Sequence, residues 1–292
     1  MSRIHEALKR AEQERTESQG SNGKASPLVE VTSAGAAGTP EAVSPFTFEA
    51  LLARCVQSQW SPDLQTMLFF SAEEGLGAEQ FRTLRSRLYQ VREKQALKKL
   101  LVTSSLPKEG KSFVAANLAQ ALVRQQGRRV LLIDGDLRAP RLHAALGAPA
   151  TPGISDYLLD EADEFSIMQR GSMENLFLIP SGRGVSNPAE LVANGRLKSL
   201  LDRVEPLFDW IIIDSPPAVP VSDAGLLANC CDGVLLVVRS GVTPFDVARK
   251  ARDEFGDKNL GVVLNAMDAA SSYPPYYYGS YGRPNGKEET KR

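Results

Sequence analysis

KLLVTSSLPKEGKSFVAANLAQAL, residues 99–122, joins an apolar strand pattern to a helical pattern through a polar loop. Gly110, Lys111 and Ser112 open the helix. A phosphate-binding P-loop requires this context, because backbone N–H groups and the helix N-terminus then face the phosphates. In the pattern G-x-x-x-x-G-K-[ST], Ser105 stands where the first glycine usually lies. On Gly-Lys-Ser alone, an ordinary capped turn is the alternative.

Apolar strand patterns alternate with helical patterns along most of the chain. The strand patterns are KLLVTSS, RRVLLID, NLFLIP, DWIIID, GVLLVVR and LGVVLN. Continuous Val, Ile and Leu runs of this kind predict parallel strands that helices cover on both faces. A helix predicted for residues 77–95 adds a packing stripe that includes Phe81 and Leu88. We expect a doubly wound, mostly parallel α/β domain of P-loop NTPase type over residues 78–268.

Three aspartates follow two of these strands. The run VLLIDGDLR carries Asp134 at the end of its apolar stretch and Asp136 two residues later. The run WIIIDSPP carries Asp214 shortly before two prolines. Ligands of open parallel sheets bind beyond the C-terminal strand ends, so we expect these carboxylates to converge on the P-loop. Carboxylates there are costly unless they hold a cation or accept hydrogen bonds. The motifs together predict a Mg²⁺-nucleotide site, in which Lys111 reaches the β- and γ-phosphates and Ser112 is a metal ligand.

Composition argues against several classes of function. The chain has 292 residues and a formal net charge of −1, so no global positive field favours nucleic acid as a partner. No apolar run approaches the roughly 20 residues of a membrane helix, and the start MSRIHEALKRAEQER is too polar for a signal peptide, so we expect a cytoplasmic protein. Cys55, Cys230 and Cys231 fit neither a disulfide framework nor a zinc spacing, and His5 and His143 lack evident ligand partners.

The two ends of the chain differ from this core pattern. Residues 1–15 carry apolar side chains at helical spacing, and residues 16–45 are small, polar and rich in helix breakers. We therefore expect an amphipathic N-terminal helix, a flexible linker, an N-terminal extension over 46–77, and a disordered tail over 269–292. The tail holds five of the seven tyrosines, at spacings that fit no packed element. They are Tyr273, Tyr276, Tyr277, Tyr278 and Tyr281.

These motifs resemble those of the bacterial tyrosine kinases of the capsule and exopolysaccharide family, which are unrelated to eukaryotic protein kinases. The shared features are the P-loop, Asp-x-Asp-x-Arg on the next strand, IIIDSPP, AEQFRTLRSRL, NPAELV at 187–192, GVVLN and the tyrosine-rich tail. The resemblance covers about residues 78–281, and the start SRIHEALKRAEQE is similar to the subgroup linked to exosortase loci. One departure is Lys108, where the family commonly has glycine.

The resemblance implies an ATP-dependent tyrosine autokinase. It implies Asp134 as the base that accepts the tyrosine proton, and Asp136 with Asp214 as residues that position Mg²⁺. Lys111 would stabilise charge on the transferred phosphoryl group. Asn265, at the end of the last strand, is implied as an adenine contact, and a turn residue is the alternative. The nucleotide-binding loop comprises Ser105, Leu106, Pro107, Lys108, Glu109, Gly110, Lys111, Ser112 and Phe113.

The resemblance also implies an assembly in which a tail reaches a neighbouring active site. Glu79, Arg82 and Arg85 share one helix face, which in the family joins subunits in a ring; a solvated salt-bridge ladder is the alternative. The tail tyrosines are then phosphoacceptors delivered in trans. The implied partners are a membrane-bound polysaccharide co-polymerase as activator and a cognate tyrosine phosphatase, with the kinase held peripherally at the inner face of the membrane.

Two other classes of function compete with this hypothesis. Positioning or partitioning ATPases of the same MinD- and ParA-like superfamily phosphorylate nothing. They commonly carry a second lysine early in the P-loop, where this chain has Leu106, and they lack a tyrosine tail. A non-catalytic regulatory scaffold would use ATP only to order a ring and the tyrosines as stacking contacts. Leu106 and the tail favour the kinase over the positioning ATPase.

Overall fold

The structure is a computed structural model, and it describes residues 47–70 and 75–267. The helix predicted for 1–15, the linker predicted for 16–45 and the tyrosine tail predicted for 269–292 lie outside the described residues. Within the described part, no helix is long and apolar enough to cross a membrane.

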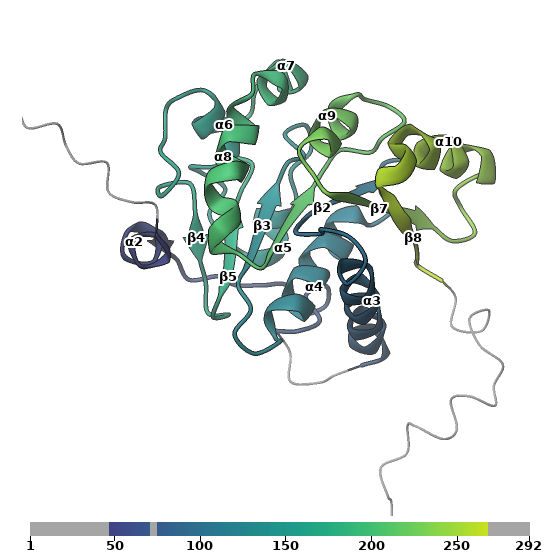
Figure 1. The fold of residues 1–292 in the computed structure, drawn as a ribbon, viewed down its shortest axis with the longest axis horizontal. Helices are drawn as coiled ribbons and strands as arrows, with labels where there is room; N and C mark the ends of the chain where they lie inside the picture. Colours follow the sequence, from purple (N-terminus) through teal and green to yellow (C-terminus); the bar gives the residue numbers. More distant parts are fainter. Residues whose placement is uncertain (1–46, 71–74, 268–292) are drawn as a thin grey trace, which may run out of the picture. The chain divides into compact units, whose positions relative to one another are not determined.

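One eight-stranded sheet organises the described residues, with strand order β1-β4-β5-β3-β6-β2-β7-β8 (Figure 1). Neighbouring strands are parallel except β4 and β5, which are antiparallel. The strands are β1 (Val56–Gln57), β2 (Lys99–Ser104), β3 (Val130–Asp134), β4 (Gln169–Arg170), β5 (Leu176–Ile179), β6 (Trp210–Asp214), β7 (Gly233–Arg239) and β8 (Asn259–Asn265). The six predicted strand patterns are confirmed as β2, β3, β5, β6, β7 and β8. The two-residue strands β1 and β4 were not predicted, because so short a strand has no periodicity to detect.

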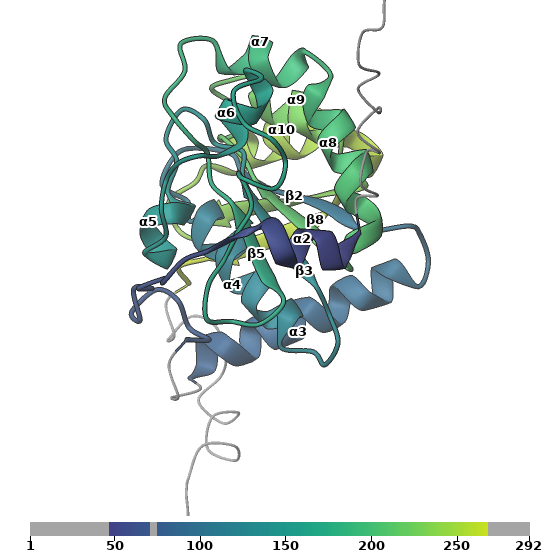
Figure 2. The ribbon, with the colours of Figure 1, turned by 90° about the vertical axis from the view of Figure 1, so that its left-hand side faces the viewer.

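Helices cover both faces of the sheet, as Figures 1 and 2 show. They are α2 (Phe48–Arg54), α3 (Leu76–Arg92), α4 (Lys111–Val123), α5 (Leu142–Leu146), α6 (Ile154–Leu158), α7 (Pro188–Ala193), α8 (Arg196–Val204), α9 (Asp223–Asn229) and α10 (Phe245–Phe255), with short 3₁₀ turns at Glu205–Leu207 and Gly256–Lys258. Side chains alternate along each strand, so the sheet separates two apolar cores. Leu236 of β7 belongs to the core with α6 to α10, whereas Leu235 and Val237 belong to the core with α3, α4 and α5.

Residues ahead of the P-loop contribute to the same fold. β1 pairs with β4, and Met67 and Phe69 are buried in the core beneath α3 and α4. The predicted packing stripe of α3 also faces this core, because Phe81 and Leu88 are buried there. Residues 47–70 of the predicted extension thus lie against the sheet that carries the P-loop.

Parallel pairing places the ends of three central strands together. β6 lies between β3 and β2, and Asp134 of β3 is in register with Asp214 of β6. The chain leaves β2 directly into the loop that leads to α4. The loops after these three strands therefore meet beyond the C-terminal ends of the strands, where α4 begins.

Candidate active site

The side chains predicted to converge on the P-loop lie together in the structure. The Nζ atom of Lys111 is 2.6 Å from Asp136 Oδ2 and 3.7 Å from Asp214 Oδ2. The hydroxyl of Ser112 donates a hydrogen bond to Asp214. Lys111, Asp134, Asp136 and Asp214 are all buried. The result is a compact polar cluster beneath the N-terminus of α4, built from residues that are far apart in sequence.

Two residues of the P-loop have left-handed backbone conformations. Gly110 has φ +94°, and a Cβ atom there would lie 2.0 Å from Asn265 Nδ2, so a larger residue would strain the backbone and displace that side chain. Lys108 also has positive φ, 66°, which is unfavourable for a residue with a side chain. The conformation of Lys108 gives a physical reason why glycine suits this position.

Asn265 holds the loop from the end of the last strand. Its Nδ2 atom donates to the carbonyl oxygen of Glu109 at 2.9 Å. The sequence suggested an adenine contact or a turn residue for this asparagine. The structure places it beside the P-loop, where its amide fixes the backbone next to Gly110.

Glu109 links the P-loop to the segment after β7. Its buried carboxylate accepts a hydrogen bond from the backbone N–H of Leu106 at 2.7 Å, and others from the hydroxyl of Thr243 and the backbone N–H of Arg239. The sequence indicates only that Glu109 is a member of the loop. No local signal predicts this role, because its partners at Arg239 and Thr243 come from a distant part of the chain.

The start of α4 is suited to an anion. The first N–H groups of a helix have no acceptor within the helix, and the helix dipole adds partial positive charge there. Burial of Lys111 opposes its charge, but Asp214 and Asp136 outweigh burial and raise its pKa, so the side chain stays cationic. An ammonium group beside free amide donors is the arrangement that binds phosphate.

Two of the aspartates, Asp134 and Asp214, have pKa values above the usual range. Burial, with a contribution from the charge of Asp214, raises the pKa of Asp134 to about 7. Burial also raises the pKa of Asp214 to about 6, although Lys111 opposes that change. The Oδ2 atom of Asp134 accepts from the backbone N–H groups of Arg141 and Leu142, at 3.2 and 3.0 Å. Asp134 is therefore held in place, and its raised pKa favours acceptance of a proton near neutral pH, which suits a general base.

The donor set fits a magnesium ion that also binds phosphate. Asp134 Oδ1 and Asp214 Oδ1 are buried and have no hydrogen-bond partner among the described residues, which is costly unless a cation or proton reaches them. Both oxygens of Asp136 already accept, from Lys111 and from the N–H of Ala139. Within residues 47–70 and 75–267, no group of three or more His, Cys, Asp and Glu side chains forms a metal site by itself. Mg²⁺ does not need one, because it usually combines one or two carboxylates with substrate phosphates and water.

An ion pair that the sequence did not predict joins the two aspartate-bearing loops, between the exposed side chain of Arg138 and the buried carboxylate of Asp223. Arg138, after β3, donates two hydrogen bonds to Asp223, at 2.8 and 2.9 Å, and Asp223 begins α9 after β6. Between the same loops, Gly135 donates its N–H to the carbonyl oxygen of Asp214 at 2.8 Å, and a Cβ there would lie 2.7 Å from that oxygen. Arg138 is the arginine of Asp-x-Asp-x-Arg, so the motif itself was the available signal.

The predicted assembly face of α3 divides into two parts. Arg82 forms an ion pair with Glu79. Arg85 instead donates to the backbone carbonyl oxygen of Ala121 in α4 at 2.7 Å. The structure therefore brings Glu79 and Arg82 together and directs Arg85 towards α4. The five tail tyrosines lie outside the described residues.

Comparisons with known proteins show the family and the fold of the chain. The sequence profile of an AAA domain matches residues 108–242. Tyrosine-protein kinase YwqD of Bacillus subtilis is 34% identical over 219 residues, which cover 74% of this chain and 92% of that protein. The crystal structure of the chimerical protein CapA2B2 has a TM-score of 0.66 at 31% identity, covering 75% of this chain and 97% of that one. The kinase domain of Escherichia coli tyrosine kinase ETK has a TM-score of 0.61 at 28% identity, covering 68% and 80%.

Proposed function

Because the chain belongs to the bacterial tyrosine-protein kinases of capsule and exopolysaccharide biosynthesis, we propose that it transfers the γ-phosphoryl group of ATP to the tyrosines of its own tail. One observation carries the proposal. The strand that ends at Asn265 closes the P-loop beside Lys111, and the first tail tyrosine, Tyr273, follows eight residues later. The tail with its tyrosines thus continues from a strand end that contacts the P-loop.

Binding of ATP uses the residues that surround the start of α4. The free N–H groups there hold phosphate oxygens. Lys111, now 2.6 Å from Asp136, exchanges that carboxylate for the β- and γ-phosphates. Ser112, Asp136 and Asp214 are the residues that would hold Mg²⁺, which neutralises phosphate charge when bound.

Transfer requires a base, because a free tyrosine has a pKa near 10 and is neutral in the cytosol. The tyrosine oxygen bonds to the γ-phosphorus while its proton passes to Asp134, and the bond to the leaving ADP breaks. The unpartnered Oδ1 of Asp134 is available for that proton. The N–H groups of Arg141 and Leu142 hold the other oxygen and fix the carboxylate.

We propose an assembly in which each tail enters the site of a neighbour. Glu79 and Arg82 on α3 would form the ring contact, whereas Arg85 also stabilises its own chain through Ala121. Arg82→Ala alone is therefore the cleaner test of the ring, with light scattering as the readout. The family also supports a membrane-bound co-polymerase as activator, a tyrosine phosphatase as antagonist, and a location at the inner face of the membrane.

The decisive experiment mixes two full-length variants with ATP and Mg²⁺. One is Lys111→Met with an intact tail, and the other is active but carries phenylalanine at its five tail tyrosines. We expect phosphate on the tail of the Lys111→Met chain, seen as mass steps of one phosphate. Lys94→Met, an exposed lysine distant from the cluster, serves as the matched control and should label itself normally.

Two outcomes would contradict the proposal. If Lys111→Met stays unlabelled while the wild type labels itself at any dilution, transfer is in cis and the ring is wrong. If the wild type shows no phosphate at all, the kinase proposal fails. A positioning ATPase, which only hydrolyses ATP, would give that second result.

A further inference from the structure

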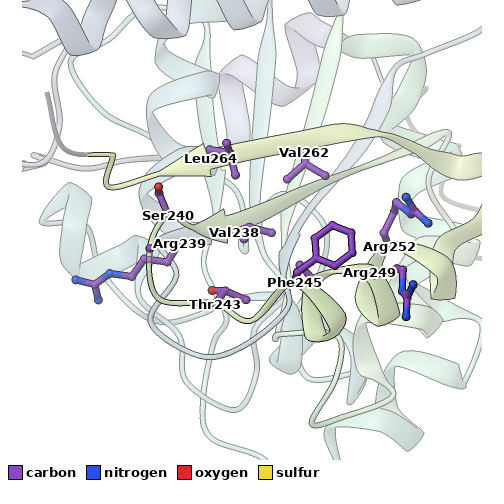
Figure 3. A pocket seen from close by; sticks show the side chains of 11 residues that line it. Val238, Arg239, Ser240, Thr243, Phe245, Arg249, Arg252, Val262 and Leu264 are labelled. Carbon is purple, nitrogen blue, oxygen red and sulfur yellow. The ribbon is translucent and has the colours of Figure 1, made fainter. Parts of the chain in front are cut away.

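An apolar groove lies between β7, β8 and α10 at the edge of the sheet (Figure 3). Its volume is about 330 Å³. Val262, Leu264 and Phe245 line it, and they are 47%, 56% and 75% exposed, which is unusual for large apolar side chains. We call this feature the α10 groove. Arg239, Arg249 and Arg252 also line it.

The α10 groove lies on the opposite face of β8 from the side chain that closes the P-loop. Neighbouring side chains of a strand point to opposite faces. Val262 and Leu264 line the groove, whereas Val263 packs against the core on the α3 and α4 side. Asn265 lies two residues after Val263, so its side chain points to the same face of β8, where it donates to Glu109. The groove therefore offers a surface that a nucleotide held by Asn265 does not use.

Arginines border the apolar centre at both ends. Figure 3 shows Arg249 and Arg252 beyond Phe245 on one side and Arg239 on the other. Arg249 and Arg252 form exposed ion pairs with Asp246 and Asp253. Exposed pairs of this kind contribute about 0–1 kcal/mol, so a dianionic ligand can replace them. Within the part of the chain that the structure describes, the guanidinium of Arg239 has no ion-pair or hydrogen-bond partner.

The chain itself supplies a segment of matching chemistry at this point. The tail leaves the end of β8, whose own side chains form the groove, and Tyr273 follows Asn265 by eight residues. A coil of eight residues spans about 15 Å on average, whereas Leu264 and Val262 lie within about 10 Å of the strand end. The tail can thus turn back along β8 without stretching. Its tyrosine rings match the apolar centre, and each phosphate adds about −1.5 to −2 charges opposite the arginines.

We propose that the α10 groove binds the phosphorylated tail of its own chain. This inference rests on the proposed function, which supplies the phosphates. Tyrosine rings pack on Phe245 and Leu264, and phosphates pair with arginines at either end of the groove. Docking removes the product tail from the neighbouring active site and leaves that site open for the next acceptor.

Binding of a synthetic peptide tests the groove without relying on kinase activity. The host is the full-length chain with phenylalanine at its five tail tyrosines, so its own tail cannot be phosphorylated. The labelled probe is residues 268–282, with or without phosphate on Tyr276, Tyr277 and Tyr278, and fluorescence anisotropy measures its binding. We expect the phosphorylated peptide to bind at least about tenfold more tightly than the unmodified one.

Matched substitutions on α10 locate the binding. Arg249→Gln with Arg252→Gln should weaken phosphopeptide binding about tenfold. Lys250→Gln removes a positive charge from an exposed residue of the same helix that does not line the groove, and it should change the affinity less than about twofold. Phe245→Ser should weaken both peptides, because the apolar centre holds the rings. Equal affinity in the arginine variant and the unaltered host, or an equal loss from Lys250→Gln, would overturn the inference.

A second experiment tests whether the tail docks in the groove of its own chain. It uses a full-length protein whose phosphorylated tail is made synthetically and ligated to the folded part. Added phosphopeptide should bind this protein at least about tenfold more weakly than the phenylalanine host, because a tethered ligand has an effective concentration near the millimolar range. Unchanged affinity, or dimers in light scattering that require the tail phosphates, would overturn docking in cis. Peptide binding that succeeds while the mixing experiment fails would sink the proposed function and leave the groove as a phosphotyrosine site. The reverse result would sink only the groove.

Discussion

The centre of the sheet and its β8 edge depart from ordinary protein packing in opposite directions. At the centre, charged side chains are buried, with Lys111, Asp134 and Asp214 only 9%, 0% and 0% exposed. At the edge, Leu264 and Phe245 are apolar and exposed. Both arrangements cost free energy in the isolated chain. Each region therefore suits a different ligand: a small, highly charged molecule at the centre, and an aromatic chain segment at the edge.

The largest expected effect is the loss of phosphorylation in Asp214→Asn. The amide oxygen still accepts from Ser112, so the fold should survive, but the negative charge proposed to position Mg²⁺ is gone. We expect tail phosphorylation to fall about 100-fold or more, as measured by intact mass over time. Asp253→Asn, an exposed aspartate at the edge region, should change the rate less than about twofold. Unchanged activity in Asp214→Asn would remove this residue from the metal site.

The second prediction concerns the pH dependence of stability in chelator-treated, nucleotide-free protein. The fold raises the pKa of Asp134 from 3.8 to about 7, so the folded state favours the protonated carboxyl. The resulting penalty is absent below about pH 4, grows as pH rises through this window and is complete above about pH 7. Asp134→Asn removes the penalty. Between pH 5 and pH 8 the variant should gain about 2 kcal/mol relative to the wild type, measured by urea unfolding.

The exposed Asp253→Asn variant again serves as the control, because it should show no such trend. A difference between Asp134→Asn and the wild type that is constant with pH would mean that the aspartate is ionised equally in the folded and unfolded states. The centre would then lack the charge penalty that distinguishes it from the edge.

A smaller effect is expected at Lys108, whose backbone is left-handed at φ 66°. Lys108→Gly removes the steric cost of a side chain in this conformation but raises the entropy of the unfolded chain. The net gain in unfolding free energy should be about 0.5 kcal/mol by urea titration. Lys250→Gly, in the ordinary backbone of α10, should instead lose about 1 kcal/mol. Equal losses in both variants would show that Lys108 is not strained.

The smallest expected effect is the change in unfolding free energy when an apolar side chain of β8 is shortened. Leu264→Ala should change the unfolding free energy by less than about 0.5 kcal/mol, because the side chain is already exposed. Leu236→Ala, on the neighbouring strand β7, should cost about 2–5 kcal/mol, since that side chain is fully buried. A large loss from Leu264→Ala would mean that the groove is filled in the folded chain.

Much of the centre could be predicted from sequence because its signals are local. Apolar runs mark β2, β3 and β6, and the three aspartates lie at the ends of β3 and β6. The rule that parallel sheets bind ligands at those ends then brings Asp134, Asp136 and Asp214 to the P-loop. No distance needed to be known in advance, since the topology alone places the three loops together.

The edge could not be predicted in this way. LGVVLN has the same apolar composition as the central strands, and a sequence run does not state whether a strand has one neighbour or two. The exposure of Val262 and Leu264 follows from the position of β8 at the end of the strand order. The contacts of Glu109 with Thr243 and of Arg138 with Asp223 were missed for a related reason, because each depends on tertiary approach between separate loops.

The carboxylate of Glu109 also has a consequence for hydrogen exchange. It accepts from the N–H group of Leu106, within the nucleotide-binding loop, and from that of Arg239, at the end of β7. One rotation of this side chain exposes both amides to solvent, so their deuterium uptake is governed by a single opening event. Two amides far apart in the chain thus form one exchange unit, and their common rate reports how often the loop beneath the phosphates opens.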